Sequence, residues 1–268
     1  IGVGLVGSEM CIRDSTISDE AGANASSGAL AANYTLTGGT HAFVINRKSV
    51  NIAGTRQYDG TTNIAAADIS SITDTVNSEV LSMSGGLGTT SSANVGAYNL
   101  TDTSQGTLIL ANGPSGANQG LASNYTLTGG TQDYTITQRV LSSSGSKAYD
   151  ANTNALAADI TLSNLVSGET LNHSGTASIS SANAASYTIT NLAGITLADN
   201  AGLASNYTLT GGTHNFTVNP KVISLSGSRL YDATTDAVAS DLTTISGLVG
   251  SETLNLSGTG SVTNANVA

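Results

Sequence analysis

Residues 206–213 read NYTLTGGT, and the same eight letters stand at 33–40 and 124–131. Within this phrase Tyr207 and Leu209 alternate with polar residues, which is typical of a half-buried strand. Two glycines follow, a pattern that favours a tight turn between paired strands. The alternation resumes after them, so we predict a β-hairpin. One face of this hairpin carries Tyr207, Leu209, Phe216 and Val218.

A second marker, Tyr followed by Asp, repeats in the same register. The Tyr-Asp pairs begin at Tyr58, Tyr149 and Tyr231, so they are 91 and then 82 residues apart. The NYTLTGGT copies are separated by the same two intervals. Two independent markers with identical spacing define one repeating unit, and its length is that of a small domain rather than a solenoid rung.

The repeat divides the chain into two complete and two partial units. Residues 16–46 form the C-terminal part of one unit, 47–137 and 138–219 are complete, and 220–268 is a truncated unit without its own NYTLTGGT copy. Neighbouring repeats of the same chain are therefore the first expected partners. We expect residues 220–268 to expose sheet edges and to aggregate or be disordered.

Residues 1–15 differ from the rest of the chain. They contain LVGSEMCIRDS at 5–15, with the single cysteine, Cys11. One set of codons for these eleven residues resembles a transposon-based sequencing adapter, and the segment has neither the basic nor the apolar region of a signal peptide. We interpret residues 1–15 as a translated adapter, and we expect no functional role for Cys11.

The composition excludes several classes of protein. Charged residues make up 10%, against about 25% in ordinary soluble proteins. The net charge is −10 with only 8 Lys and Arg, so we expect neither nucleic acid nor an anionic membrane as a partner. Apolar runs are too short for membrane insertion, and one cysteine cannot form a disulfide framework.

The remaining pattern favours short strands separated by Gly, Asn and Ser turns. Residues 154–158, Asn-Ala-Leu-Ala-Ala, are the one place where a short helix is predicted. The expected fold class is all-β. We expect tandem small β-sandwich or β-grasp-like repeat domains in an elongated array, with at most one short helix per unit.

The motif Tyr58-Asp59-Gly60-Thr61-Thr62, together with the NYTLTGGT phrase, resembles the YDG-type repeat domain. It is similar to the mostly-β-grasp repeats of haemagglutinin-like, filamentous bacterial adhesins. The resemblance covers nearly all of residues 16–268. The other copies have Ala151 and Ala233 in place of the glycine, which argues against a role for positive φ at this position.

The resemblance implies a structural stalk or adhesive repeat region of a large secreted or surface-displayed protein. It implies an extracellular or cell-surface location, and a host or surface glycan or protein receptor as a partner. The alternative is a glycan- or calcium-binding β-domain module. No nucleophile–base pair, P-loop or zinc motif stands out, so we expect no enzyme activity and no catalytic or cofactor-binding residue.

Recurring acids are the candidates for a metal site. Each unit places one Asp after the Tyr, a second Asp before an Ile or Leu, and a Glu before a strand. Oxygen ligands of this kind could hold Ca²⁺, whereas the alternative for the first Asp is an Asx-turn, and no dense Asp-x-Asp-x-Asp loop is present. The calcium candidates are Asp59, Asp68, Glu79, Asp150, Asp159, Glu169, Asp232, Asp241 and Glu252.

Histidines and tyrosines are interpreted as structural. His41 and His214 share one position of the repeat, where the intervening copy has Gln132, so catalysis or metal binding there is disfavoured. We expect these histidines and His173 to be exposed strand or turn residues. The tyrosines of the Tyr-Asp pairs either form a glycan platform or, the reading we favour, anchor the core with their hydroxyls bonded at an edge.

Overall fold

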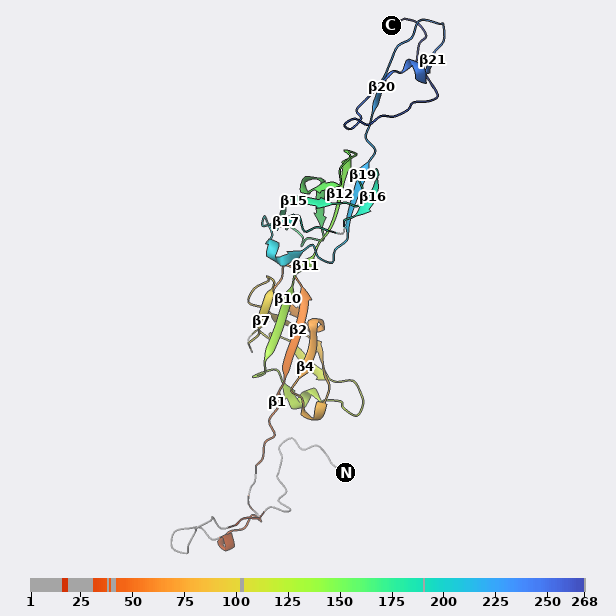
Figure 1. Ribbon diagram of the computed structural model, residues 1–268. Coiled ribbons are helices and arrows are strands. Elements are labelled where there is room, and N and C mark those ends of the chain that lie inside the picture. The colour runs from red at the N-terminus through yellow and green to blue at the C-terminus, as the bar shows by residue number, and fades with distance from the viewer. Residues whose placement is uncertain are drawn as a thin grey trace.

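The structure is a computed structural model, and it describes residues 16–18, 31–37, 39, 42–101, 104–189 and 191–267. The predicted all-β class is confirmed: the described residues form short strands in many small sheets, with single 3-10 turns and no α-helix. Figure 1 shows these sheets following one another along an extended molecule. No helix in the described residues is long and apolar enough to cross a membrane. Cys11 and His41 lie outside the described residues.

Two four-stranded sheets have the same strand order. The first is β4 (Ile69–Thr73), β2 (Asn51–Gln57), β10 (Gln132–Thr137) and β7 (Gly96–Asn99). Its central strands, β2 and β10, are parallel, and both outer pairs are antiparallel. This mixed pattern brings the beginning and the end of unit 47–137 together in one sheet.

The second sheet repeats this arrangement in unit 138–219. It is β14 (Ile160–Ser163), β12 (Ser142–Ala148), β19 (His214–Asn219) and β16 (Ala185–Thr188), with β12 and β19 parallel. The order of first, last and internal strands is therefore the same in both units.

Smaller sheets surround these two. The parallel two-stranded pairs are β1 (Lys48–Ser49) with β9 (Tyr125–Thr126), and β11 (Arg139–Val140) with β18 (Tyr207–Thr208). The antiparallel ones are β3 (Asn63–Ala65) with β6 (Leu87–Thr89), β5 (Leu81–Gly85) with β8 (Ile109–Asn112), β15 (Asn172–Ser178) between β13 (Asn154–Leu156) and β17 (Ile195–Ala198), β20 (Ser224–Ser226) with β22 (Thr244–Ser246), and β21 (Asp236–Val238) with β23 (Thr259–Ser261).

Single 3-10 turns separate the strands, and all but the turn at 76–78 recur at equivalent points of the units. They are η1 (Ala31–Asn33), η2 (Ala66–Asp68), η3 (Val76–Ser78), η4 (Ala122–Asn124), η5 (Ala157–Asp159), η6 (Ala204–Asn206) and η7 (Ala239–Asp241). The helix predicted at 154–158 is strand β13 followed by η5. A run of five residues is too short for a stable α-helix, and pairing with β15 favours the strand.

The predicted hairpin is wrong. β18 and β19 do not pair with each other; both run parallel to the chain that opens the unit, with Tyr207 opposite Arg139 and His214 opposite Ser143. Gly211, with φ +87°, and Gly212 form a loop that bulges from this strand, closed by the Gly212 N–H to Leu209 O bond of 3.3 Å. The glycines interrupt one strand instead of reversing it.

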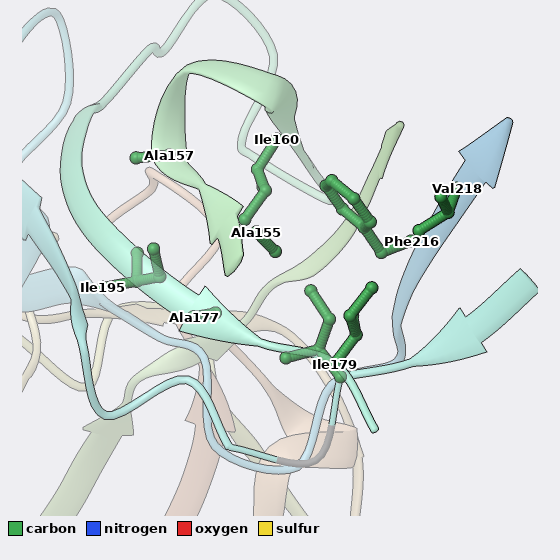
Figure 2. Close-up of a cluster of buried hydrophobic side chains, with 9 residues drawn as sticks. Ala155, Ala157, Ile160, Ala177, Ile179, Ile195, Phe216 and Val218 are labelled. Carbon is green, nitrogen blue, oxygen red and sulfur yellow. The ribbon is translucent and has the colours of Figure 1, made fainter. Parts of the chain in front are cut away.

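Three of the four residues predicted on one face separate into two clusters, and the fourth, Leu209, packs against both. Phe216 and Val218 pack with Ala155, Ile160 and other residues of unit 138–219, as Figure 2 shows. Tyr207 belongs to a different cluster, which we call the junction cluster because it contains residues of both complete units. A third cluster, including Val50 and Ile52, lies within unit 47–137.

The described residues 220–267 contain short strands but no buried side chain. Their two small sheets, β20 with β22 and β21 with β23, have no counterpart of the long parallel strand β19. The expectation of exposed sheet edges agrees with this, and the expected aggregation stays a prediction.

Candidate functional site

The contact between units 47–137 and 138–219 is centred on one carboxylate. Tyr58 of the first unit donates a hydrogen bond of 2.5 Å to Glu169 Oε1, and Tyr207 of the second donates one of 2.6 Å to Glu169 Oε2. The two rings meet edge to face, with centroids 5.4 Å apart. We call Tyr58, Glu169 and Tyr207 the junction triad.

The two tyrosines of the triad are buried and their phenols are held protonated, whereas Glu169 is partly exposed. Tyr58 is 5% and Tyr207 2% exposed. Burial, and then the hydrogen bond to Glu169, raise the pKa of each phenol to about 12. Both effects disfavour a second negative charge beside the carboxylate, so both hydroxyls remain donors across the neutral range.

The junction cluster extends this contact into a shared core. Five of its buried residues come from the first unit and three from the second. The members are Tyr58, Ile64, Leu100, Tyr134 and Ile136, with Leu141, Leu171 and Tyr207. Neither unit buries this apolar surface alone, so the contact stabilises the relative position of the two units.

Asn206, next to Tyr207, adds a second polar contact across the junction. It is 1% exposed. The Val95 N–H donates to Asn206 Oδ1 at 2.9 Å, and Asn206 Nδ2 donates to Asn94 Oδ1 at 3.0 Å. A buried amide with both ends bonded fixes the register of the two surfaces, because a shift would leave buried polar atoms without partners.

A single residue separates the last strand of the first unit from the first strand of the second, and its side chain is held by hydrogen bonds. Gln138 lies between β10 and β11, and its Nε2 donates to the carbonyls of Ser205 and Tyr207 at 3.1 and 2.9 Å. Arg139 follows, donating from Nη1 to Tyr58 O at 3.4 Å and from Nε to Asn164 O at 2.6 Å. The connection is therefore short and bonded to both units.

The other two recurring glutamates also accept phenol hydrogen bonds. Tyr149 donates to Glu252, which joins unit 138–219 to the segment that follows it. Tyr125 donates to Glu79 Oε2 at 2.6 Å within the first unit. The three recurring glutamates thus all accept hydrogen bonds from tyrosine hydroxyls. Only Glu169 accepts two such bonds among the described residues, one on each carboxylate oxygen.

The predicted calcium ligands are dispersed. No group of three His, Cys, Asp or Glu side chains able to hold a metal occurs in the part of the chain that the structure describes. Glu79, Glu169 and Glu252 bind tyrosines, while Asp68, Asp159 and Asp241 end the turns η2, η5 and η7. Asp68 Oδ2 also accepts the Ala65 N–H at 2.9 Å.

The Asp of each Tyr-Asp pair forms the Asx-turn that was the alternative to calcium. Asp59, Asp150 and Asp232 accept backbone N–H bonds from residues two positions later, at 2.9, 3.1 and 3.0 Å. Each also pairs with a basic side chain three positions earlier. The bond from the Thr234 N–H is the main reason that the pKa of Asp232 falls to about 2.

The expectation of exposed histidines is wrong for His214 and His173. His214 is 4% exposed, with Nδ1 2.9 Å from Ser143 Oγ and Nε2 2.8 Å from Leu209 O. His173 is half-buried, with Nε2 3.0 Å from the carbonyls of Ala157 and Ile160. Gln132 occupies the repeat position of His214, and its Nε2 donates a hydrogen bond of 2.8 Å to Leu127 O, the carbonyl that matches Leu209 O. A glutamine can therefore replace the histidine at this position.

The tyrosines of the Tyr-Asp pairs differ in burial. Tyr58 anchors a core as expected, Tyr149 is half-buried, and Tyr231 is 63% exposed. Sequence reasoning found these tyrosines but missed Asn206 and Gln138, and it missed the link from Tyr58 to Glu169. The available signal was that every complete unit contains a single Glu together with the Tyr of the Tyr-Asp pair and the Tyr of the NYTLTGGT phrase.

The model of the YDG domain family matches residues 132–215, so this part of the chain is similar to a YDG domain. The matched residues include Tyr149, Glu169, Asn206 and Tyr207. No curated protein and no solved structure matches the chain.

Proposed function

We propose that this chain is a structural stalk or adhesive repeat region of a large secreted or surface-displayed bacterial adhesin. Its units are β-grasp-like domains in tandem, and their role is mechanical rather than catalytic. The mixed sheets with parallel central strands support the β-grasp-like alternative over an all-antiparallel sandwich.

The observation that carries this proposal is the junction between the two complete units. It combines a shared apolar core, the junction triad and the one-residue connection at Gln138. Units joined in this way resist bending, because bending separates Tyr58 from Glu169 and exposes the junction cluster. Stiffness is the property that a stalk needs.

The surface suits extracellular display and weak contacts with a glycan or protein receptor. A net charge of −10 and a surface rich in hydroxyls and amides keep neighbouring molecules apart without strong ion pairing. Repetition of the same unit turns weak contacts into avidity, which is how a stalk of this kind also acts as an adhesive.

Stiffness is tested by measuring the distance between the two units. Spin labels at Ser70→Cys and Thr161→Cys, both exposed, in a Cys11→Ser chain report it by double electron–electron resonance. We expect one narrow distribution, which Glu169→Ala broadens. The matched control is Glu79→Ala, which removes a carboxylate bonded to a tyrosine of its own unit. A broad distribution in the parent chain would contradict the stalk.

Surface display is tested separately. Antibodies against residues 138–219 should label intact cells that express the complete open reading frame, and mild protease should remove the label. Labelling only after the cells are permeabilised would place the protein inside the cell and overturn this part of the proposal.

A further inference from the structure

Each complete unit begins and ends in one pair of parallel strands. In unit 47–137, β2 near the start of the unit pairs with β10 at its end over six residue pairs. In unit 138–219, β12 and β19 also pair over six. We call these two pairings the terminal ladders. The shorter parallel pairs, β1 with β9 and β11 with β18, continue each interface toward the start of its unit. Both ends of a unit are therefore held by one interface.

Tension on the chain acts along a terminal ladder and not across it. Because its strands are parallel, the chain enters the ladder at one end of the first strand and leaves at the opposite end of the second. Tension therefore pulls the two strands in opposite directions along their own axes. The hydrogen bonds of a parallel pair are evenly spaced, so this shear loads them together. A force across the ladder would break them one after another.

The same tension passes directly from one unit to the next. Gln138 is the only residue between β10, which ends one unit, and β11, which begins the next. Figure 1 shows β2, β10, β12 and β19 running along the length of the molecule. The outer strands of the two four-stranded sheets lie beside this path, because the chain neither enters nor leaves a unit through them. The two terminal ladders are therefore loaded in series.

The terminal ladder of unit 138–219 is bonded at both of its ends. At the beginning, the Ser143 N–H donates to Thr213 O at 3.0 Å, and at the end the Tyr149 N–H donates to Asn219 O at 2.8 Å. A side-chain contact joins the same strands, because Ser143 Oγ lies 2.9 Å from Nδ1 of the buried His214. Separation from either end must therefore begin by breaking one of these bonds.

Packing across this ladder also opposes sliding of its strands. Phe216 lies opposite Gly145, and a Cβ on that glycine would be 2.8 Å from Phe216 Cδ2. Figure 2 shows Phe216 and Val218 on β19 beside the buried core of the unit. The next residues on the same face of β12, Ser143 and Lys147, both carry side chains. Sliding would therefore drive the aromatic ring from the glycine against a larger residue.

We propose that the complete units are tension-bearing elements, which stay folded under a stretching force because each terminal ladder has to be sheared as a whole. This function rests on the proposed role as a stalk and goes beyond it. The junction between the units resists bending, whereas the terminal ladders resist stretching along the chain. A stalk that attaches a cell to a surface in flowing liquid carries such tension.

Single-molecule force spectroscopy on the full chain tests the proposal. Handles at the two chain ends load the terminal ladders in shear. Handles on Ser144→Cys and Thr210→Cys, in a Cys11→Ser chain, load unit 138–219 across its ladder, because both exposed residues lie near the beginning of β12 or β19. At one loading rate we expect the chain-end geometry to need about twofold or more force, because the six pairs rupture together. Equal melting temperatures would verify that the cysteines leave the fold unchanged.

The length released identifies each unit in the chain-end experiment. Corresponding markers are 91 and 82 residues apart, so the two unfolding events should differ in contour length by roughly 30 Å. Phe216→Leu keeps an apolar side chain but removes the ring that faces Gly145. It should lower the unfolding force of the shorter event and leave the longer event unchanged, which is a control within the same molecule.

Equal unfolding forces for the two pulling geometries would overturn the proposal. An unchanged force of the shorter event in Phe216→Leu would overturn the part assigned to the aromatic ring. Neither result would alter the distance distribution between labels at Ser70 and Thr161, which is measured without load. Failure of the tension-bearing function is therefore distinguishable from failure of the stalk.

Discussion

Ala151 has a φ of +61°, in the left-handed region that disfavours residues with a Cβ. Gly60 and Ala233 occupy the same position of the repeat with φ of +80° and +63°. The turn after the Tyr-Asp pair therefore requires positive φ in every unit, contrary to the expectation from the alanines. The Asx-turn, with the Asn152 N–H bonded to Asp150, holds the backbone in this conformation.

Ala151→Gly should stabilise unit 138–219. Relief of left-handed strain outweighs the greater freedom of glycine in the unfolded chain, so we expect the free energy of unfolding to rise by about 0.5–1 kcal/mol. Urea denaturation of the full chain measures it. As a control, Ala155→Gly in β13, where alanine is fully buried, should be destabilising. A lower stability of Ala151→Gly would show that the turn is not strained.

At the scale of the strand, glycine is needed where the backbone lies so close to other atoms that a Cβ would not fit. A Cβ on Gly145 would lie 2.4 Å from Asp159 O and 2.8 Å from Phe216 Cδ2, so both the backbone and the ring would have to move. Gly54 has the same relation to Asp68 O and Tyr134 in the first unit. These glycines let an aromatic side chain of the neighbouring parallel strand pack directly against the backbone.

Gly145→Ala should therefore destabilise its unit by about 1–3 kcal/mol, the usual effect of overpacking. Gly96→Ala is the matched control: it is also a strand glycine, but its Cβ would meet only Tyr98 atoms at 3.4 Å or more. Thermal unfolding of both variants checks the difference. Equal melting temperatures of the two variants would mean that the packing of Phe216 does not require glycine at position 145.

The repeat, the all-β class and the alternation of Phe216 and Val218 were predictable, because each depends on local spacing. The pairing of β18 and β19 was not. A Gly-Gly pair between two alternating runs is typical of a hairpin, and only the opening strand of the unit, about 70 residues earlier, shows that both runs pair elsewhere. The registers Arg139 with Tyr207 and Ser143 with His214 are non-local, and no short motif encodes them.

The candidate site was predicted in its parts and not in its assembly. Glu169 was recognised as recurring but was assigned to calcium, since a carboxylate alone does not reveal whether its partner is a cation or a phenol. The bond to Tyr58 spans 111 residues and crosses a unit boundary. Asn206 lies in the repeated phrase, yet its burial depends on the preceding unit, so the sequence of one unit cannot indicate its role.

At the scale of the whole molecule, the junction triad predicts that strongly alkaline solution separates the units. The pKa values of Tyr58 and Tyr207 are raised from 10.0 to about 12 in the folded chain. A raised folded pKa contributes stability that is fully present below pH 10 and is lost as pH rises from 10 to 12. The loss should be on the order of 2 kcal/mol for each phenol, because ionisation places a second negative charge beside Glu169.

The distance between labels at Ser70 and Thr161 follows this change at neutral pH, pH 10 and pH 12. We expect the distribution to stay narrow to pH 10 and to broaden reversibly by pH 12. Tyr58→Phe removes one ionisation, so its distribution should already be somewhat broader at neutral pH and change less between pH 10 and 12. Tyr34→Phe, at an exposed phenol outside the junction, controls for general alkaline effects. If Tyr58→Phe and the parent chain broaden equally between pH 10 and 12, the phenols do not couple the units.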